Sequence, residues 1–273
     1  MCLPPRGRPC WRVVPRTICL AVLALLMARS TYAQAADPFV IAAVRATSPP
    51  AIDGVVDERE WEGAARGERF IQFEPTRGAA SNFETVVMVF YDEGHLYVAF
   101  QAWDAEPLMS QMTQRDADLW NDDSVQIYLD SFYDRRSGYM FMTNVLGTQA
   151  DGRVAEDGVS VDNAWDAAWQ SATRTTAFGW SAEFAIPFSS IKYASGESTT
   201  WGINFSRTRR RTFERSYWAG PVDHWGRMSQ AGSLVGLNVA PPARRHQFIP
   251  TLCRAARKAA HRLGPSASTS VTP

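Results

Sequence analysis

The stretch Trp120-Asn-Asp-Asp-Ser-Val-Gln-Ile-Tyr-Leu-Asp130 has the pattern of a β-strand preceded by an acidic turn. From Ser124 onward apolar and polar residues alternate, and Val125, Ile127 and Leu129 share one side. A period of two is typical of a strand with one face in the core and the other outside it. The sequence therefore predicts a half-buried strand over residues 124–130.

The polar face of this strand has a composition that suits a sugar. If extended geometry continues back through the turn, Trp120 lies on the same side as Gln126 and Tyr128. An indole stacks on the C–H face of a sugar ring while neighbouring amide and phenol groups bond its hydroxyls. The alternative is that Trp120 only covers a sheet edge and that Asp122 and Asp123 form a turn.

Strand patterns recur along most of the chain. The predicted strands cover residues 40–46, 85–91, 96–103, 139–145, 169–175, 180–186, 201–208, 216–218 and 232–239. Many short strands at regular spacing with little helix are typical of an antiparallel β-sandwich. We therefore predict an all-β fold, an antiparallel and jelly-roll-like β-sandwich with one or two short helices.

Other segments are expected to be helix or loop. Asp57 is followed three residues later by Glu60, a capping-box pattern that predicts a short helix carrying Trp61. Ser189–Tyr193 reads as a short helical or irregular link. The Gly- and Asp-rich residues 147–163 are expected to form a loop.

A net charge of zero conceals an uneven distribution of charge. All 28 acidic residues lie in 36–239, together with 17 of the 28 Lys and Arg, so this body carries a net charge near −11. A body this acidic repels phosphate backbones, which argues against nucleic acid as a partner. Residues 240–273 are basic, without acids, and we expect a tail outside the domain that is disordered or truncated.

Residues 1–35 have the composition of a signal peptide. Arginines precede an apolar run from Ile18 to Ala28, which is too short to span a bilayer as a helix, and small residues follow at Ala33 and Ala35. We expect cleavage there and export to the periplasm or cell surface of a Gram-negative bacterium. Only Cys253 would then remain, so no internal disulfide and no Cys-based metal site are expected.

Motifs for nucleophilic catalysis are absent from the sequence, which has no Gly-x-Ser-x-Gly elbow and no His-x-x-x-His pair. Glu183 is a lone acid on an otherwise apolar predicted strand. A glycosidase needs two carboxylates at a defined separation, and the sequence fixes no such pair. We therefore expect no catalytic activity, with O-glycosyl hydrolysis as an alternative.

Charged residues in predicted turns have two interpretations each. The carboxylates of Asp92, Asp104, Asp122 and Asp123 could ligate calcium, or they could be solvated turn acids. The run Arg207-Thr-Arg-Arg-Arg211 could bind an anion, but a surface ion-pair network with partners such as Glu214 is the favoured interpretation.

Five motifs together resemble the family 9 carbohydrate-binding modules over residues 40–239. They are Ile52-Asp-Gly with Trp61, Tyr91-Asp-Glu followed by Leu96-Tyr-Val, the stretch from Trp120 to Asp130, Glu183-Phe-Ala-Ile-Pro-Phe, and Trp201-Gly-Ile-Asn-Phe-Ser-Arg. Asp134-Arg-Arg-Ser-Gly-Tyr139 and Ser216-Tyr-Trp218 are similar to a subgroup that forms the N-terminal part of bacterial outer-membrane proteins. In that subgroup a barrel-like region follows, and the resemblance therefore implies an outer-membrane barrel partner for this chain.

The resemblance implies a calcium-supported β-sandwich that clamps a sugar end between two tryptophans. Trp120 matches the first tryptophan and Trp225 the second. Gln126 lies where other members carry glutamate, and Asn144 lies on a strand that supplies polar contacts. Met142 replaces an expected arginine.

These observations divide the sequence into three segments and predict one main function. Residues 1–35 are the signal peptide, 36–239 the carbohydrate-binding β-sandwich and 240–273 the tail. The expected function is capture of a polysaccharide or oligosaccharide for carbohydrate catabolism, through Trp120, Gln126, Asn144 and Trp225. The alternative is a structural or docking domain of a truncated outer-membrane protein that no longer binds sugar.

Overall fold

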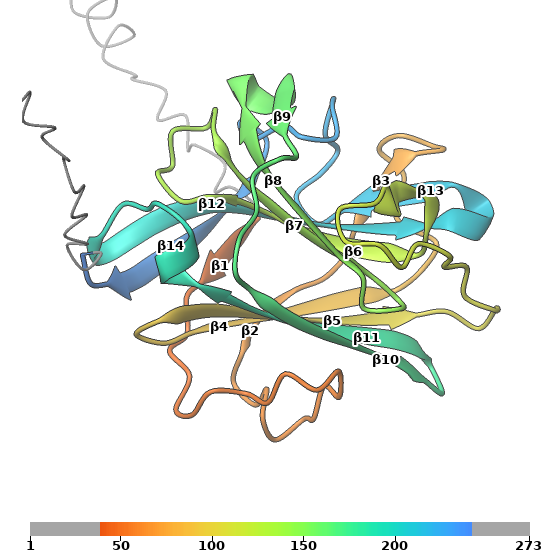
Figure 1. Cartoon of the computed structure of the whole chain (residues 1–273), viewed down its shortest axis with the longest axis horizontal. Coiled ribbons are helices and arrows are strands. Elements are labelled where there is room, and N and C mark those ends of the chain that lie inside the picture. Colours follow the sequence, from red (N-terminus) through yellow and green to blue (C-terminus); the bar gives the residue numbers. More distant parts are fainter. Residues whose placement is uncertain (1–38, 242–273) are drawn as a thin grey trace, which may run out of the picture. The chain divides into compact units, whose positions relative to one another are not determined.

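Two β-sheets packed face to face make up the domain (Figure 1). The computed structural model describes residues 39–241. The larger sheet has nine strands, in the order β1 (Val40–Ala42), β14 (Gly232–Val239), β12 (Gly196–Arg209), β6 (Ser124–Asp130), β7 (Gly138–Asn144), β8 (Gln149–Ala155) and β9 (Ser160–Asp162), with β13 (Glu214–Tyr217) joining β12 to β3 (Ile71–Glu74). The smaller sheet has the order β10 (Gln170–Thr176), β11 (Gly179–Pro187), β5 (His95–Trp103), β4 (Thr85–Tyr91) and β2 (Ala65–Gly67).

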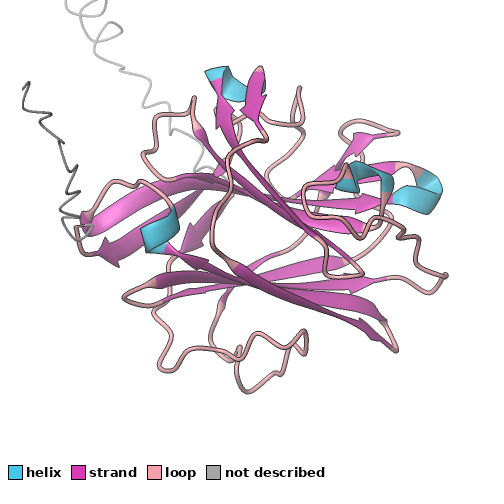
Figure 2. Cartoon of the chain, in the orientation of Figure 1, coloured by secondary structure: helices cyan, strands magenta, loops and turns pink. Residues whose placement is uncertain are grey.

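The predicted all-β sandwich is confirmed, with two differences of detail. One pair, β1 with β14, is parallel, whereas the other strand pairs of the described chain are antiparallel. Helix is limited to four three-residue 3₁₀ segments within residues 39–241 (Figure 2): η1 (Leu119–Asn121), η2 (Glu156–Gly158), η3 (Phe188–Ser190) and η4 (Arg210–Thr212).

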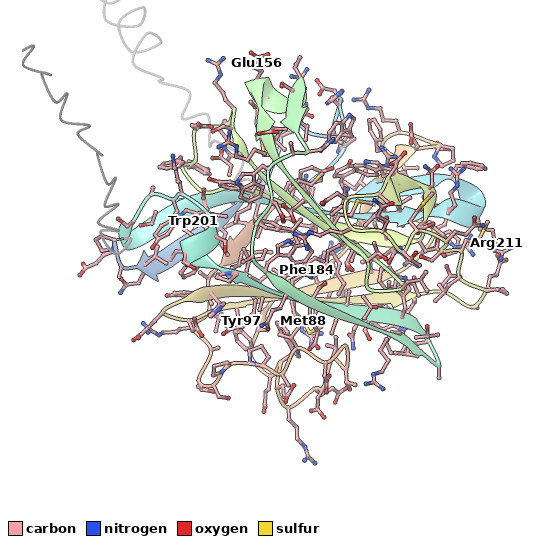
Figure 3. The ribbon with its side chains drawn as sticks, in the orientation of Figure 1. Met88, Tyr97, Glu156, Phe184, Trp201 and Arg211 are labelled. Atoms are coloured by element: carbon pink, nitrogen blue, oxygen red, sulfur yellow. The ribbon has the colours of Figure 1, made fainter. Side chains whose placement is uncertain are left out.

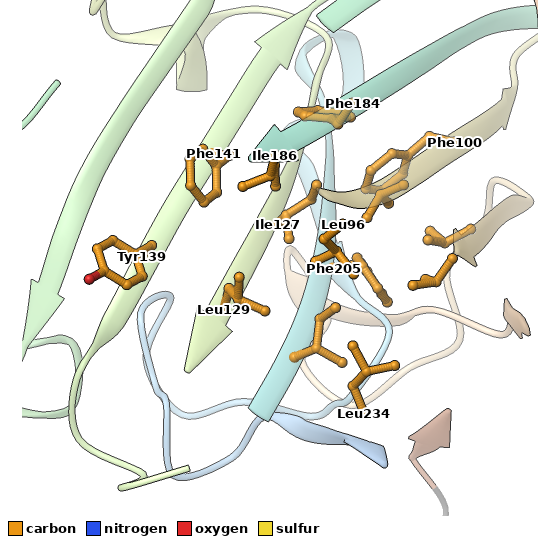
Figure 4. Close-up of a cluster of buried hydrophobic side chains, with 14 of the residues drawn as sticks. Leu96, Phe100, Ile127, Leu129, Tyr139, Phe141, Phe184, Ile186, Phe205 and Leu234 are labelled. Carbon is orange, nitrogen blue, oxygen red and sulfur yellow. The ribbon is translucent and has the colours of Figure 1, made fainter. Parts of the chain in front are cut away.

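The main core lies between the two sheets and is built from the apolar side of each alternating strand (Figure 4). Ile127 of β6, Phe100 of β5, Phe184 of β11 and Phe205 of β12 are each 0% exposed. Phe205 stands edge-on to Phe100, with ring centroids 5.9 Å apart, a favourable arrangement of aromatic rings. The alternation read from the sequence therefore selects the core side of these strands correctly.

A second apolar layer covers the outer face of the smaller sheet. Met88 and Tyr97 lie on that side, away from Phe184 (Figure 3). The segment before β2 folds over them, and Trp61 stacks on Phe90 with ring centroids 5.7 Å apart. Nε1 of Trp61 donates to the carboxylate of Glu183 at 2.9 Å.

The helix predicted at Asp57 is wrong, because this segment forms consecutive turns. The Asp57 carboxylate accepts from the backbone N–H of Arg59, two residues on, rather than from the third residue of a helix. The backbone N–H groups of Asp53 and Gly54 donate to Glu183. These contacts tie the segment to the sheet, so tertiary bonding overrides the local capping pattern.

The predicted loop at 147–163 is also wrong, because β8 and β9 form a hairpin there, with Glu156 at its tip (Figure 3). Strand β8 is rich in small and polar residues and lacks the β-branched run that is typical of a strand, so its sequence did not predict it. Glycine is favoured at position 152, because a Cβ there would lie 3.2 Å from Cγ1 of Val161. Strands β2 and β3 were likewise not anticipated.

The arginine run forms an ion-pair network, as expected, but two of its members are inside the protein. Arg207 and Arg209 are each 3% exposed, and Arg209 donates to both carboxylate oxygens of Asp104. Burial alone would raise the pKa of Asp104, but the Arg209 hydrogen bonds lower it overall. Glu214 is not the partner, because it accepts from Ser81 and Asn82 instead.

No helix within residues 39–241 is long and apolar enough to cross a membrane. The predicted signal peptide lies outside the described residues, and so does the predicted tail after its first two residues.

Candidate functional site

The polar side of β6 is covered, so the expectation of a half-buried strand is wrong. All seven residues of β6 are buried, including Gln126 at 1% and Tyr128 at 3% exposure. Strands β13 and β3 and the loop after β13 place a third apolar cluster over this face, in which Tyr128 packs with Tyr217. Trp120 and Trp225 stand at the margin of this cluster and are half-buried.

Trp120 is positioned by η1 and by the acidic pair that follows it. Leu119 is buried and anchors the segment. The Asp122 carboxylate accepts from the backbone N–H groups of Gln111 and Met112. Asp123 accepts from the backbone N–H groups of Met109 and Arg210. The acidic pair therefore acts as a structural anchor that fixes the turn carrying Trp120.

Trp225 is positioned by a loop that rests on the tip of the β8–β9 hairpin. Gly158 has φ +89°, and a Cβ added to it would lie 2.5 Å from the carbonyl of Gly226. Arg227 and Ser229 both donate to Asp157 of the same hairpin. The Tyr217 hydroxyl donates to the Trp225 carbonyl at 3.1 Å, so the loop is held from two sides.

The structure brings the two tryptophans together, but not as a parallel clamp. Their ring centroids are 5.7 Å apart and their planes meet at 71°. A sugar ring between two parallel indoles needs about 7–8 Å, twice a carbon–carbon contact distance of about 3.5–4.0 Å. The clamp implied by the resemblance is therefore not formed in this conformation, and the rings make a corner instead.

A hollow of about 270 Å³ opens beside this corner. Its floor is apolar, with Met140 and Met142 of β7, and its walls include Trp120, Trp225 and Val161. The volume is just below the range of about 300–1,000 Å³ for small-molecule sites. The hollow is therefore sized for one sugar ring at a chain end.

The polar groups of the hollow are acceptors for hydroxyl donors. Its polar lining residues are Asp116, Asp118, Asp151 and Asn163. Burial raises the pKa of Asp151, and hydrogen bonding by Trp169 and the charge of Arg115 oppose that effect. Arg115 lies 2.6 Å from Asp151, so this carboxylate is fixed in place, while Asp116 and Asp118 are exposed.

The two other predicted site residues do not reach the hollow. The Gln126 carbonyl accepts from the hydroxyls of Tyr128 and Ser206, and its amide faces the sulfur of Met142. Asn144 is 0% exposed; it donates to Met112 and Asp122 and accepts from two backbone N–H groups. Both side chains are bonded within the protein, and neither lines the hollow.

The candidate calcium ligands are bonded to protein donors. Asp92 accepts from Gly94, His95 and the Tyr97 hydroxyl, and the other three candidate acids accept from the partners given above. Residues 39–241 contain no group of three or more His, Cys, Asp or Glu arranged to hold a metal ion. The four candidate acids are therefore not gathered at one calcium site, and the calcium implied by the resemblance stays an untested prediction.

Glu183, the lone acid on a predicted strand, is bonded within the protein and has a structural role. It is 0% exposed and binds the Asp53–Gly54 turn and Trp61. Burial raises the pKa of Glu183 to about 6. It ties the outer apolar layer to the smaller sheet and is not among the residues lining the hollow.

Four polar residues that line the hollow were not predicted from the sequence: Asp116, Asp118, Asp151 and Asn163. The first two precede Trp120 in the same segment, so their spacing was a usable signal. Asp151 and Asn163 fall within the stretch taken for a loop, and the pairing of β8 with β7 is what brings Asp151 to the site.

The fold and the hollow define a β-sandwich with an aromatic-lined hollow on one sheet face, and comparisons with known proteins give its family. The sequence profile of the family "Carbohydrate family 9 binding domain-like" matches residues 52–236. The chain belongs to this family. No curated protein sequence matches the chain significantly.

Solved structures show the same fold. A family 9 carbohydrate-binding module from Caldicellulosiruptor kristjanssonii in complex with cellotriose aligns with a TM-score of 0.55 at 18% identity, covering 77% of this chain and 99% of that one. The same organism's module in complex with glucose aligns with a TM-score of 0.54 at 18% identity, covering 76% and 98%. At this identity the likeness establishes the fold.

Proposed function

We propose that the hollow beside Trp120 and Trp225 binds one terminal sugar unit of a neutral or substituted glycan. The single observation that carries this proposal is the pair of half-buried indoles, which meet at a corner over an apolar floor. A half-buried indole next to the exposed carboxylates of Asp116 and Asp118 offers both kinds of contact that a sugar ring makes. The complexes of similar structures with cellotriose and glucose support this assignment.

In the proposed mode the sugar stacks on one indole and touches the other with its edge. Its hydroxyls donate to Asp116 and Asp118 at the rim, and Asn163 both donates and accepts. The Asp151 side chain is 0% exposed and accepts from Arg115, Trp169 and Ala167, so it holds the wall of the hollow and is not a contact for the sugar. Each indole is expected to contribute about 1 kcal/mol beyond the burial of its area. No catalytic step is proposed for this site.

Calorimetric titration of the protein with glucose, cellotriose and xylotriose tests the proposal. Trp120→Ala and Trp225→Ala are each expected to weaken binding about fivefold or more. Trp103→Ala is the matched control, because this half-buried tryptophan lies on the smaller sheet and packs on Phe178. Binding that survives loss of both site tryptophans would refute the proposed mode.

A second candidate, a docking domain without sugar binding, is favoured by one observation. The two indoles contact each other, and neither Gln126 nor Asn144 has a free polar group facing the hollow. If the wild type binds none of a panel of glycans while remaining folded, this candidate replaces the first. A barrel-like region of an outer-membrane protein is the proposed docking partner.

We also propose that the protein is exported and serves carbohydrate catabolism at the surface of a Gram-negative cell. The support is the sequence pattern of residues 1–35, with arginines before the apolar run Ile18–Ala28. N-terminal sequencing of the mature protein is expected to begin after Ala33 or Ala35. A mature chain that begins at Met1 and stays in the cytoplasm would contradict export.

A further inference from the structure

Arg215 of β13 lies on the Trp120 ring without an acidic partner. Its guanidinium carbon is 3.9 Å from the indole centroid and 6.0 Å from the centroid of Phe73. Its Nε is buried and has no hydrogen-bond partner. Across the described chain, no other arginine has a buried side-chain nitrogen left unbonded. An unsatisfied buried donor is costly and calls for an explanation.

The surroundings of Arg215 make its lack of an ion pair notable. Glu74 is its partner in the β13–β3 register, yet no ion pair joins their side chains within residues 39–241. By contrast, the half-buried Arg227 binds two carboxylates, those of Asp157 and Asp223. In a body with a net charge near −11, a half-buried guanidinium without a carboxylate is available to a ligand.

Half-buried side chains from three other segments continue the site past Trp120. Phe73 comes from β3, Arg215 from β13 and Trp225 from the following loop. The contacts run from Phe73 to Arg215, from Arg215 to Trp120 and from Trp120 to Trp225. The proposed terminal sugar therefore has a neighbouring surface on which a second unit or a substituent can lie.

We propose that Arg215 is a specificity-determining residue that binds a carboxylate carried by the glycan, as in a uronic acid unit. This inference rests on the proposed function and deepens it. A guanidinium presents planar N–H pairs that match a carboxylate, and its stacking on an indole pre-orders the fork. The bound carboxylate accepts from the terminal N–H groups of Arg215, because no hydrogen bond or ion pair in the described chain joins this side chain to an acceptor.

The acids of the hollow do not cancel this preference. Trp120 lines the hollow, whereas Arg215 does not. An indole face covered by a guanidinium at 3.9 Å has no room for a sugar, so the hollow and Arg215 contact the ring on different sides. Asp116 and Asp118 would repel a carboxylate, so the sugar unit next to them is uncharged. The acidic unit lies on the Arg215 side of the ring.

The test compares two disaccharides that differ by one carboxylate. Calorimetry at low salt measures the full chain against cellobiose and against cellobiouronic acid, in which one hydroxymethyl group is a carboxylate. The wild type is expected to bind the acidic sugar about fivefold to tenfold more tightly, just below the range for charge-assisted hydrogen bonds, because the site is half open. The ratio is expected to shrink as salt screens the pair.

Three variants assign the preference to Arg215. Arg215→Gln is expected to bring the affinity ratio of the acidic to the neutral sugar near one while cellobiose binding remains. Arg215→Lys is expected to keep part of the preference for the acidic sugar, because its ammonium group is still a point charge. Arg174→Gln is the control, because it removes one exposed charge on β10 of the other sheet and should leave the ratio unchanged. Thermal unfolding of each variant checks the fold.

The outcomes separate this inference from the proposed function. A wild type that binds both sugars equally, or an Arg215→Gln variant that keeps the full ratio, overturns the assignment of Arg215 alone. A folded wild type that binds neither sugar overturns the proposed function, and this inference with it.

Discussion

The contact between Trp120 and Trp225 makes a measurable prediction about the ligand-free protein. The indoles meet edge-to-face at 5.7 Å and 71°, and such pairs contribute about 0.5–1.5 kcal/mol beyond area burial. Trp120→Ala also removes the Arg215 stacking contact. Because Trp120 is only half-buried, we expect it to cost about 2–3 kcal/mol, below the 3–5 kcal/mol of a fully buried tryptophan.

A double-mutant cycle isolates the contact. The free energies of unfolding of the wild type, Trp120→Ala, Trp225→Ala and the double variant are measured by urea denaturation with circular dichroism. The two single changes are expected to sum to about 1 kcal/mol more than the double change. A second cycle, pairing Trp120→Ala with Trp103→Ala on the other sheet, should be additive within about 0.5 kcal/mol.

Additivity in the first cycle would refute the corner geometry. It would mean that the rings do not touch in solution and that a slot between them is open before the ligand arrives. If both cycles show the same coupling, the effect is a general response of the domain rather than a ring contact. The first result would favour a parallel clamp over the corner described here, and the second would leave the ring contact without support.

Three further predictions concern the framework of the site. Burial raises the pKa of Glu183 to about 6 from 4.5, so the stability it adds is fully present below about pH 4.5 and is lost as pH rises through 6. The wild type should therefore lose about 1–2 kcal/mol of its free energy of unfolding relative to Glu183→Gln between pH 4.5 and pH 7. The same difference between the two proteins at both pH values would contradict this. Gly158→Ala should cost about 2 kcal/mol or more and weaken glycan binding, because its Cβ meets the backbone of Gly226. Gly63→Ala, where φ is also positive but nothing lies within 4 Å, should cost about 1–2 kcal/mol without affecting binding. Since the turn acids are bonded to protein donors, EGTA should leave the thermal midpoint unchanged, and a midpoint that drops and recovers with calcium would show a metal site.

Local patterns predicted the strands well where the apolar side alone defined them. The predicted strands 85–91, 124–130 and 232–239 have the same bounds in the structure as β4, β6 and β14. Alternation along a strand depends on near neighbours, so it is readable from sequence. The hairpin of β8 and β9 was not readable, because its strands contain small and polar residues that only pairing makes extended.

The candidate site was predictable only in part. Trp120 and Trp225 were identified from the sequence, and they do meet, although 105 positions separate them in the chain. Gln126 lies on the expected side of β6, but its accessibility could not be predicted. Its polar face is buried by β13, β3 and the following loop, which come from distant parts of the chain.

By itself, the sequence determined the two-sheet fold class, the core side of the main strands and the two tryptophans of the candidate site. These features follow from residue type and period, which each segment carries without reference to the rest. Only the tertiary structure decided the angle between the indoles, the burial of Gln126 and Asn144, and the stacking of Arg215 on Trp120. Each of these depends on strands that pair across long stretches of chain, because a side chain's neighbours outside its own strand are set by packing rather than by local order.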